Sequence, residues 1–454
     1  MHVERTRLAA LATIATIATI ATIAAMVLGL AGLAAAAAAA TTAAAAVPIA
    51  AVDPAVARLA VAALSADAAA APTAVEDLRR AGPDAVPALL AAQAEHPVDD
   101  ARFRARLDQV CAQRDCAASR LFWYTDLERA KAVARRTGRP ILSLRLLGRL
   151  DEEMSCANSR FFRTVLYGNE GVSRLLREGF VLHWTSERPV PKVTIDFGDG
   201  RALKGTITGN SIHYVLDPRG RLVDALPGLY GPRAFQRLLE MDRKQALSLS
   251  TVDDPMFAFE LGGFHEAELA RIDAALDRDV ELVGASRQAA RDERRRPRSR
   301  VTPTAYDAAS LATTKSASER VPLAALSIAG RQQKVAGVDW EGIASLHGED
   351  WALDAHSVAE LERKQAARDP DPASRRGAIR RFQRLVGVDT VRNEALFHAV
   401  LHAWLARSHY VEDLDRFNER VYTVLFLTPR SDPWLGLAAP ETFMALDPAG
   451  QGQR

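Results

Sequence analysis

The stretch "GRLDEEMSCANSRFF" (Gly148–Phe162) carries one of the three cysteines of the chain. The apolar run "PILSLRLL" before it predicts a β-strand, and the second half of the stretch predicts the start of a helix. A thiol at a helix N-terminus faces unpaired backbone N–H groups and the positive end of the helix dipole, and both lower its pKa. Cys156 is therefore the first candidate for chemistry, and Arg160, one turn further on, would add to the effect.

Regular elements are expected on both sides of this stretch. A helix is predicted before it, in "DLERAKAVARRTG", with Asp126 as N-cap and Gly138 as the stop. The elements expected after it are the helices "NSRFFRTVLY" and "EGVSRLLREG", the strands "FVLHW" and "VTIDF", the hairpin "SIHYVLD–PRG–RLVDALPG" and the closing helix "GPRAFQRLLEMDRKQ".

This order of elements resembles the thioredoxin-like superfamily over residues 121–245, in the single-cysteine form found in some large bacterial proteins. Members commonly carry a Cys-x-x-Cys at the helix start and a cis-proline beside it. Here Ser159 stands at the second cysteine position of Cys156-Ala157-Asn158-Ser159, and Ser211 stands at the proline position. The resemblance implies an α/β thioredoxin-like domain in which Cys156, Ser159 and Arg160 form the catalytic group and Asn210 and Ser211 line the substrate groove.

Two functions follow from this arrangement. Without a second cysteine, Cys156 could still attack a protein thiol or disulfide partner and hold a mixed disulfide, which is a monothiol exchange activity. Alternatively, Cys156 is a small buried residue, as free cysteines often are, and the fold serves as a non-enzymatic binding scaffold. Neither function requires a cofactor, and we expect none.

Cys111 and Cys116 lie five residues apart on an expected helix. If that helix is continuous, their side chains point in different directions and a direct disulfide would be strained. In an oxidising compartment one of them could pair with Cys156 instead. The sequence leaves the pairing open.

The N-terminus predicts export. Arg5 and Arg7 precede a run without charged residues that reaches Val52 and contains a block of alanines, as in a signal peptide. The run is longer than a usual signal core, so an uncleaved membrane anchor is the alternative. We expect an exported, periplasmic or otherwise extracytoplasmic protein that meets the membrane only through this segment, if the segment is not cleaved.

A second candidate site lies on the helix expected in "DTVRNEALFHAVLHAWL", with Asp389 as its N-cap. Glu394, His398 and His402 recur at intervals of four and share one face of that helix. Two histidines at this spacing can chelate a metal ion with a carboxylate as third ligand. Because such pairs are common by chance, we expect weak binding or none.

Composition and breakers divide the chain of 454 residues into regions. Lys and Arg number 58 and Asp and Glu 56, a balance that argues against a dedicated nucleic-acid binder. The sequence contains no phosphate-binding glycine loop, dinucleotide fingerprint or HExxH motif. The expected regions are the N-terminal segment 1–52, a helical region 53–120, the thioredoxin-like domain 121–245, a helix and basic linker 246–315, and a mainly helical region 316–454.

Overall fold

The computed structural model describes residues 53–67, 69–207, 209–295, 305–318, 338–408 and 411–431. The predicted signal or anchor segment, residues 1–52, lies outside the described residues. The described residues from Pro54 onward form one compact unit. Within the described ranges, none of the helices is both long and apolar enough to cross a membrane.

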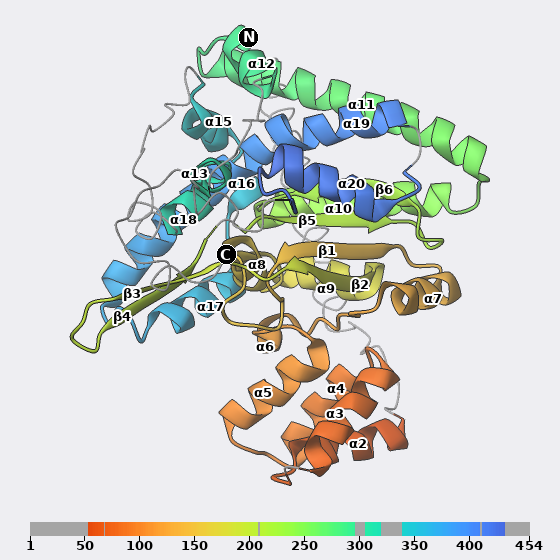
Figure 1. Cartoon of the computed structure of the whole chain (residues 1–454), viewed down its shortest axis with the longest axis vertical. Helices are drawn as coiled ribbons and strands as arrows, with labels where there is room; N and C mark the ends of the chain where they lie inside the picture. Colours follow the sequence, from red (N-terminus) through yellow and green to blue (C-terminus); the bar gives the residue numbers. More distant parts are fainter. Residues whose placement is uncertain are drawn as a thin grey trace, which may run out of the picture. The chain divides into compact units, whose positions relative to one another are not determined.

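A four-stranded mixed sheet lies at the centre of this unit (Figure 1). The strand order is β2-β1-β5-β6, with β1 parallel to β2 and antiparallel to β5, and β5 antiparallel to β6. The strands are β1 (Ile141–Leu147), β2 (Val181–Arg188), β5 (Ser211–Leu216) and β6 (Leu222–Pro227). Helices flank the sheet and make up most of the chain, which confirms the α/β part of the predicted fold class.

The first helix and the closing hairpin follow the sequence pattern closely. Helix α7 (Leu127–Thr137) is capped by Asp126, whose carboxylate accepts the Arg129 N–H, and it ends at Gly138 in a left-handed conformation. β5 and β6 form the predicted hairpin around the turn at Gly220. The strands β1, β5 and β6 are rich in apolar residues, and they are buried along their whole length.

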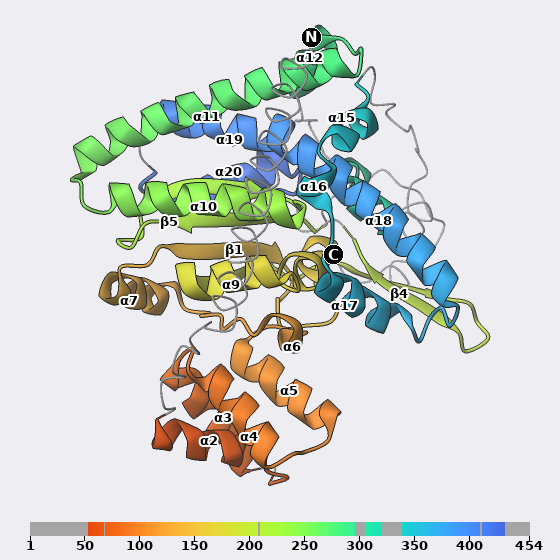
Figure 2. The same ribbon diagram turned by 180° about the vertical axis from the view of Figure 1, so that it is seen from behind.

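Successive side chains of a strand point to opposite faces of the sheet, and here helices cover both faces. On β5, His213 packs against Phe162 and against Phe235 of helix α10 (Pro232–Leu249). The next residue, Tyr214, contacts Phe417 of helix α20 (Leu414–Arg420) on the other face. Figure 2 shows α10 and α9 (Glu170–Gly179) on the side opposite to α20.

The polypeptide between β1 and β2 supplies the candidate thiol. It contains the short helix α8 (Ala157–Phe161), a π-helical turn η1 (Phe162–Leu166) and α9. A separate two-stranded hairpin, β3 (Lys192–Asp196) and β4 (Ala202–Thr206), follows β2 and carries the predicted "GDG" turn. It extends away from the four-stranded sheet (Figure 1).

The N-terminal region is helical, as predicted. Its helices are α2 (Pro54–Leu64), α3 (Ala70–Ala81), α4 (Ala85–Glu95), α5 (Asp100–Cys111) and α6 (Cys116–Ser119). Cys111 and Cys116 form a disulfide, because the helix is not continuous between them. Ala112 and Asp115 both adopt the left-handed conformation, which reverses the chain and brings the two Cα atoms to 6.3 Å.

The helices after the sheet belong to the predicted helix-and-linker region and to the C-terminal region. They are α11 (Asp254–Leu282), α12 (Arg287–Arg295), α13 (Ala305–Ala309), α15 (Trp340–Leu346), α16 (Gly348–Trp351), α17 (Ala355–Gln365), α18 (Pro372–Arg392), η2 (Asn393–His398), α19 (Ala399–Ser408) and η3 (Val421–Leu425).

Two details of these helices differ from the sequence interpretation. Part of the expected basic linker is the helix α12, held to α11 by Arg291–Asp277 and Arg294–Asp273 ion pairs. Asp389 is not an N-cap, because α18 already begins at Pro372.

Candidate functional site

Cys156 caps helix α8, as the sequence predicts. Its Sγ accepts the backbone N–H of Ser159 at 3.4 Å and lies 3.1 Å from the Ser211 hydroxyl. The Cys156 backbone N–H donates to the carbonyl of Leu147 at the end of β1. The structure therefore brings the predicted cysteine and both serines together, and it buries all three completely.

Ser159 and Arg160 hold the backbone of this turn in place. The Ser159 hydroxyl donates to the Cys156 carbonyl at 2.9 Å and lies 2.7 Å from the Ser155 hydroxyl. The Arg160 guanidinium donates to the Ser155 carbonyl at 2.5 Å and to the Thr206 hydroxyl at 2.6 Å. The hydrogen bonds of Arg160 thus run to a carbonyl and a hydroxyl beside the thiol, and this side chain fixes the loop.

Asn210 and Ser211 lie where the resemblance places a substrate groove, but other parts of the chain occupy that place. The Asn210 carbonyl accepts the phenol O–H of Tyr422 at 3.1 Å, and its side-chain oxygen accepts the Lys315 ammonium at 3.3 Å. The peptide bond before Ser211 is trans. Asn210 is 3% exposed, so the described structure offers a substrate no open groove at these two residues.

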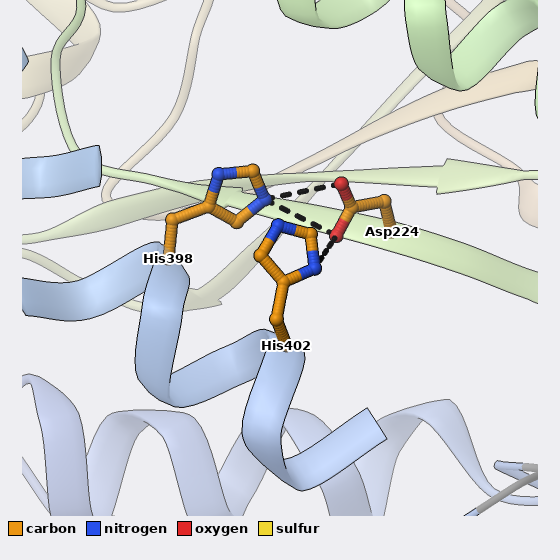
Figure 3. Close-up of side chains that lie close together, drawn as sticks. All are labelled: Asp224, His398 and His402. Atoms are coloured by element: carbon orange, nitrogen blue, oxygen red, sulfur yellow. Dashed lines mark hydrogen bonds and ion pairs between the residues drawn. The ribbon is translucent and has the colours of Figure 1, made fainter. Parts of the chain in front are cut away.

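The second predicted site is rearranged. His398 and His402 do come together, with ring centroids 4.0 Å apart, but Glu394 points elsewhere and binds Arg271 at 2.9 Å. The physical reason is the π-helical turn η2, because an i→i+5 hydrogen-bond pattern breaks the four-residue spacing on which the shared face depends. The carboxylate beside the two histidines belongs to Asp224 of β6 (Figure 3).

Four polar side chains form this cluster, which we call the Asp224 cluster: Asp224, His265, His398 and His402. His398 Nε2 lies 3.0 and 3.2 Å from the two Asp224 oxygens, and His402 Nδ1 lies 3.9 Å from Asp224 Oδ1. His265 of α11 adds its Nδ1 at 2.8 Å from His402 Nδ1. All four side chains are buried, so the cluster lies inside the core.

Burial and the neighbouring histidines shift the pKa of Asp224 in opposite directions. Burial alone would raise the pKa of Asp224, but His398, His402 and His265 outweigh it and hold that pKa well below its ordinary value. Burial, together with the negative charge of Asp224, raises the pKa of the neighbouring Asp242 well above its usual range. Burial lowers the pKa of His402 well below its ordinary value and that of His265 to about 4.

Comparison with family models, with curated proteins and with solved structures finds no match to this chain.

Three residues of these sites were missed by the sequence analysis. Gly209 touches Cys156 so closely that an added Cβ would lie 2.1 Å from the cysteine Cβ. For Asp224 the sequence offered one indication of a buried site, which is a charged residue inside the apolar strand "LVDALP". His265 gave none, since the apolar-polar pattern of α11 does not distinguish it from any other histidine that packs in a core.

A groove of about 360 Å³ lies beside the disulfide. It is bounded by α3, by the end of α5 and by the loop after β1. Its lining residues are Pro72, Val75, Glu76, Arg79, Arg106, Gln109, Ala112, Thr125, Arg149 and Asp151. Charges of both signs line this groove, which suits a polar partner that carries both charges better than an apolar one.

Proposed function

We propose that this protein is an exported binding scaffold built on a degenerate thioredoxin-like fold, in which Cys156 is not a redox centre in the folded state. The single observation that carries the proposal is the complete burial of the Cys156 thiol between Ser159, Ser211 and Gly209. Thiol–disulfide exchange needs the sulfur to reach a partner sulfur in line, and a buried thiol cannot do so.

The thioredoxin-like part of the proposal has topological support. The parallel pair β1 and β2 is connected through the helices that start at Cys156, and the antiparallel pair β5 and β6 follows. Ser211, the residue in the cis-proline position of the resemblance, opens β5 and touches the thiol. The two departures, Ser159 and Ser211, both remove features that dithiol chemistry uses.

The binding role is proposed for the groove beside the Cys111–Cys116 disulfide. Its mixed lining of Arg79, Arg106 and Arg149 with Glu76 and Asp151 would suit a polar segment of a protein partner. The near balance of charge over the chain argues against a nucleic-acid partner.

The test is the alkylation of Cys156, the one thiol outside a disulfide. We expect the native protein to react at least about a hundredfold more slowly than the unfolded protein, because reagent reaches the thiol only through local opening. The rate is measured against pH with Cys156→Ser as the blank. Tyr422→Ala removes a side chain bonded to Asn210 and should raise the native rate.

The competing function, monothiol exchange, makes the opposite prediction. The Ser159 N–H and the Ser211 hydroxyl could both donate to a thiolate. Rapid alkylation of the native protein, with a midpoint below the ~8.5 of a free cysteine, would establish a reactive thiol and refute the scaffold proposal.

Export is the remaining part of the proposal. It rests on Arg5 and Arg7 before the charge-free run, and on the Cys111–Cys116 disulfide, which suits an oxidising compartment. Mass spectrometry of protein from the native host should find a mature N-terminus within or after the alanine block. Full-length protein in the cytosol would contradict export, and full-length protein in the membrane would identify an anchor.

A further inference from the structure

The Asp224 cluster joins three parts of the chain that are far apart in sequence. Asp224 comes from β6, His265 from α11, and His398 and His402 from η2 and α19. Figure 3 shows the two imidazoles of His398 and His402 turned toward the Asp224 carboxylate from one side. One ligand atom from each of Asp224, His398 and His402 lies within 4.8 Å of the other two.

The separations suit a small ion. Zinc binds imidazole nitrogen and carboxylate oxygen at about 2.0–2.1 Å, so neighbouring ligand atoms of a tetrahedral site lie about 3.3 Å apart. Asp224 Oδ1 lies 3.2 Å from His398 Nε2 and 3.9 Å from His402 Nδ1. The first separation is close to the tetrahedral value, and a closing movement of about half an ångström would bring the second to it.

Without an ion the cluster is poorly satisfied. A single proton is shared by the Nδ1 atoms of His265 and His402. If His265 donates it, the proton of a neutral His402 lies on Nε2, which is buried without a partner. If His402 donates it, the proton of a neutral His265 lies on His265 Nε2. That nitrogen is buried and has no hydrogen bond of normal geometry. The Val223 backbone offers the His265 ring only a weaker interaction.

We propose that the Asp224 cluster binds one divalent transition-metal ion of the zinc type through Asp224, His398 Nε2 and His402 Nδ1. Two imidazoles and one carboxylate suit zinc, cobalt or nickel, whereas magnesium and calcium prefer oxygen ligands. All three ligand side chains are buried in the core, so the site is structural. The ion fastens η2 and α19 to the edge strand β6.

The surroundings of the ligands set the affinity. Outer hydrogen-bond partners of the ligands fix their orientation and raise the affinity of a metal site. The outer nitrogens of His398 (Nδ1) and His402 (Nε2) have no hydrogen-bond partner in the described structure. Each missing outer partner typically lowers metal affinity 10- to 100-fold, so this site should bind about 10²- to 10⁴-fold more weakly than a fully supported one. The proposal departs from the weak or absent binding expected for the Glu394 set, because the ligand set is different.

The experiment uses the full mature chain, washed with a chelator and titrated with zinc. We expect one ion per chain by elemental analysis and a melting temperature raised by about 3 to 5 °C at a hundredfold excess over the dissociation constant. Cobalt in place of zinc should give the intense visible absorption of a tetrahedral site.

Matched variants identify the ligands. His398→Ala and His402→Ala should lose the ion, whereas Glu394→Gln should keep it, because Glu394 pairs with Arg271 outside the cluster. Should the alanine variants fail to fold, the wild-type titration and the cobalt spectrum still decide the question. The proposal is overturned if folded wild-type protein takes up no stoichiometric ion at about 10⁻⁴ M zinc, or if His398→Ala retains it.

Discussion

Replacing Gly209 by alanine will destabilise the protein by about 3 kcal/mol or more. The new Cβ would lie 2.1 Å from the Cys156 Cβ and 3.1 Å from its Cα, and Cys156 cannot move away freely. Its backbone N–H is bonded to Leu147 and its Sγ to Ser159 and Ser211. Urea unfolding of wild type and variant measures the loss.

Two further variants make this test specific. Cys156→Gly removes the atom that the new methyl group meets, so adding it to Gly209→Ala should recover part of the lost stability in a double-mutant cycle. Gly263 lies exposed in α11 with open space around an added Cβ, and Gly263→Ala should stabilise by about 0.5–1 kcal/mol. An equal loss at both glycines would show that the close approach to Cys156 is not the cause.

Lowering the pH from 7 to 5 will remove about 4 kcal/mol of stability through two buried histidines. Burial, helped by Arg145, lowers the pKa of His183 to about 3, and burial alone lowers that of His213 to about 3. Both are therefore neutral when folded and protonate near pH 6.5 when unfolded. The stability they contribute is complete above pH 6.5 and is lost as the pH falls toward 3, at about 2 kcal/mol for each histidine by pH 5.

The contribution of one histidine can be isolated. His213 Nε2 is hydrogen-bonded to the Tyr167 hydroxyl at 2.7 Å, so His213→Phe is combined with Tyr167→Phe to avoid leaving a buried hydroxyl unpaired. The double variant should lose about 2 kcal/mol less than wild type between pH 7 and 5. His96→Gln, at an exposed helix end, serves as the matched control variant. A pH dependence equal to that of wild type in the double variant would contradict the assignment.

Local sequence signals predicted much of the sheet region. Asp126 and Gly138 mark the two ends of α7, and the strand "PILSLRLL" ends at Leu147 as β1 does. The position of Cys156 at a helix start follows from the same local pattern. These features depend on residues near each other in the chain, where capping and alternation act.

The candidate sites were less predictable, because they depend on local irregularities and on distant residues. Glu394 was chosen on α-helical spacing, but the extra residue of the η2 turn rotates the residues on either side of it by about 100°. Asp224 lies 174 residues before His398, and no local pattern connects them. The disulfide depends on Ala112 in a left-handed conformation that alanine seldom adopts.

The cover over the Cys156 region also determines the order in which the chain can fold. Asn210 is bonded to Tyr422, which lies 212 residues later, and Arg188 reaches the carbonyl of Pro429 across 241 residues. Contacts of such long range form late, because closing the loop between them costs entropy that local contacts do not. While the chain is being made from its N-terminus, the strands of the sheet are therefore complete before the segment that carries Tyr422 and Pro429. We expect Asn210, next to the Ser211 that contacts the thiol, to stay uncovered until the C-terminal region is made.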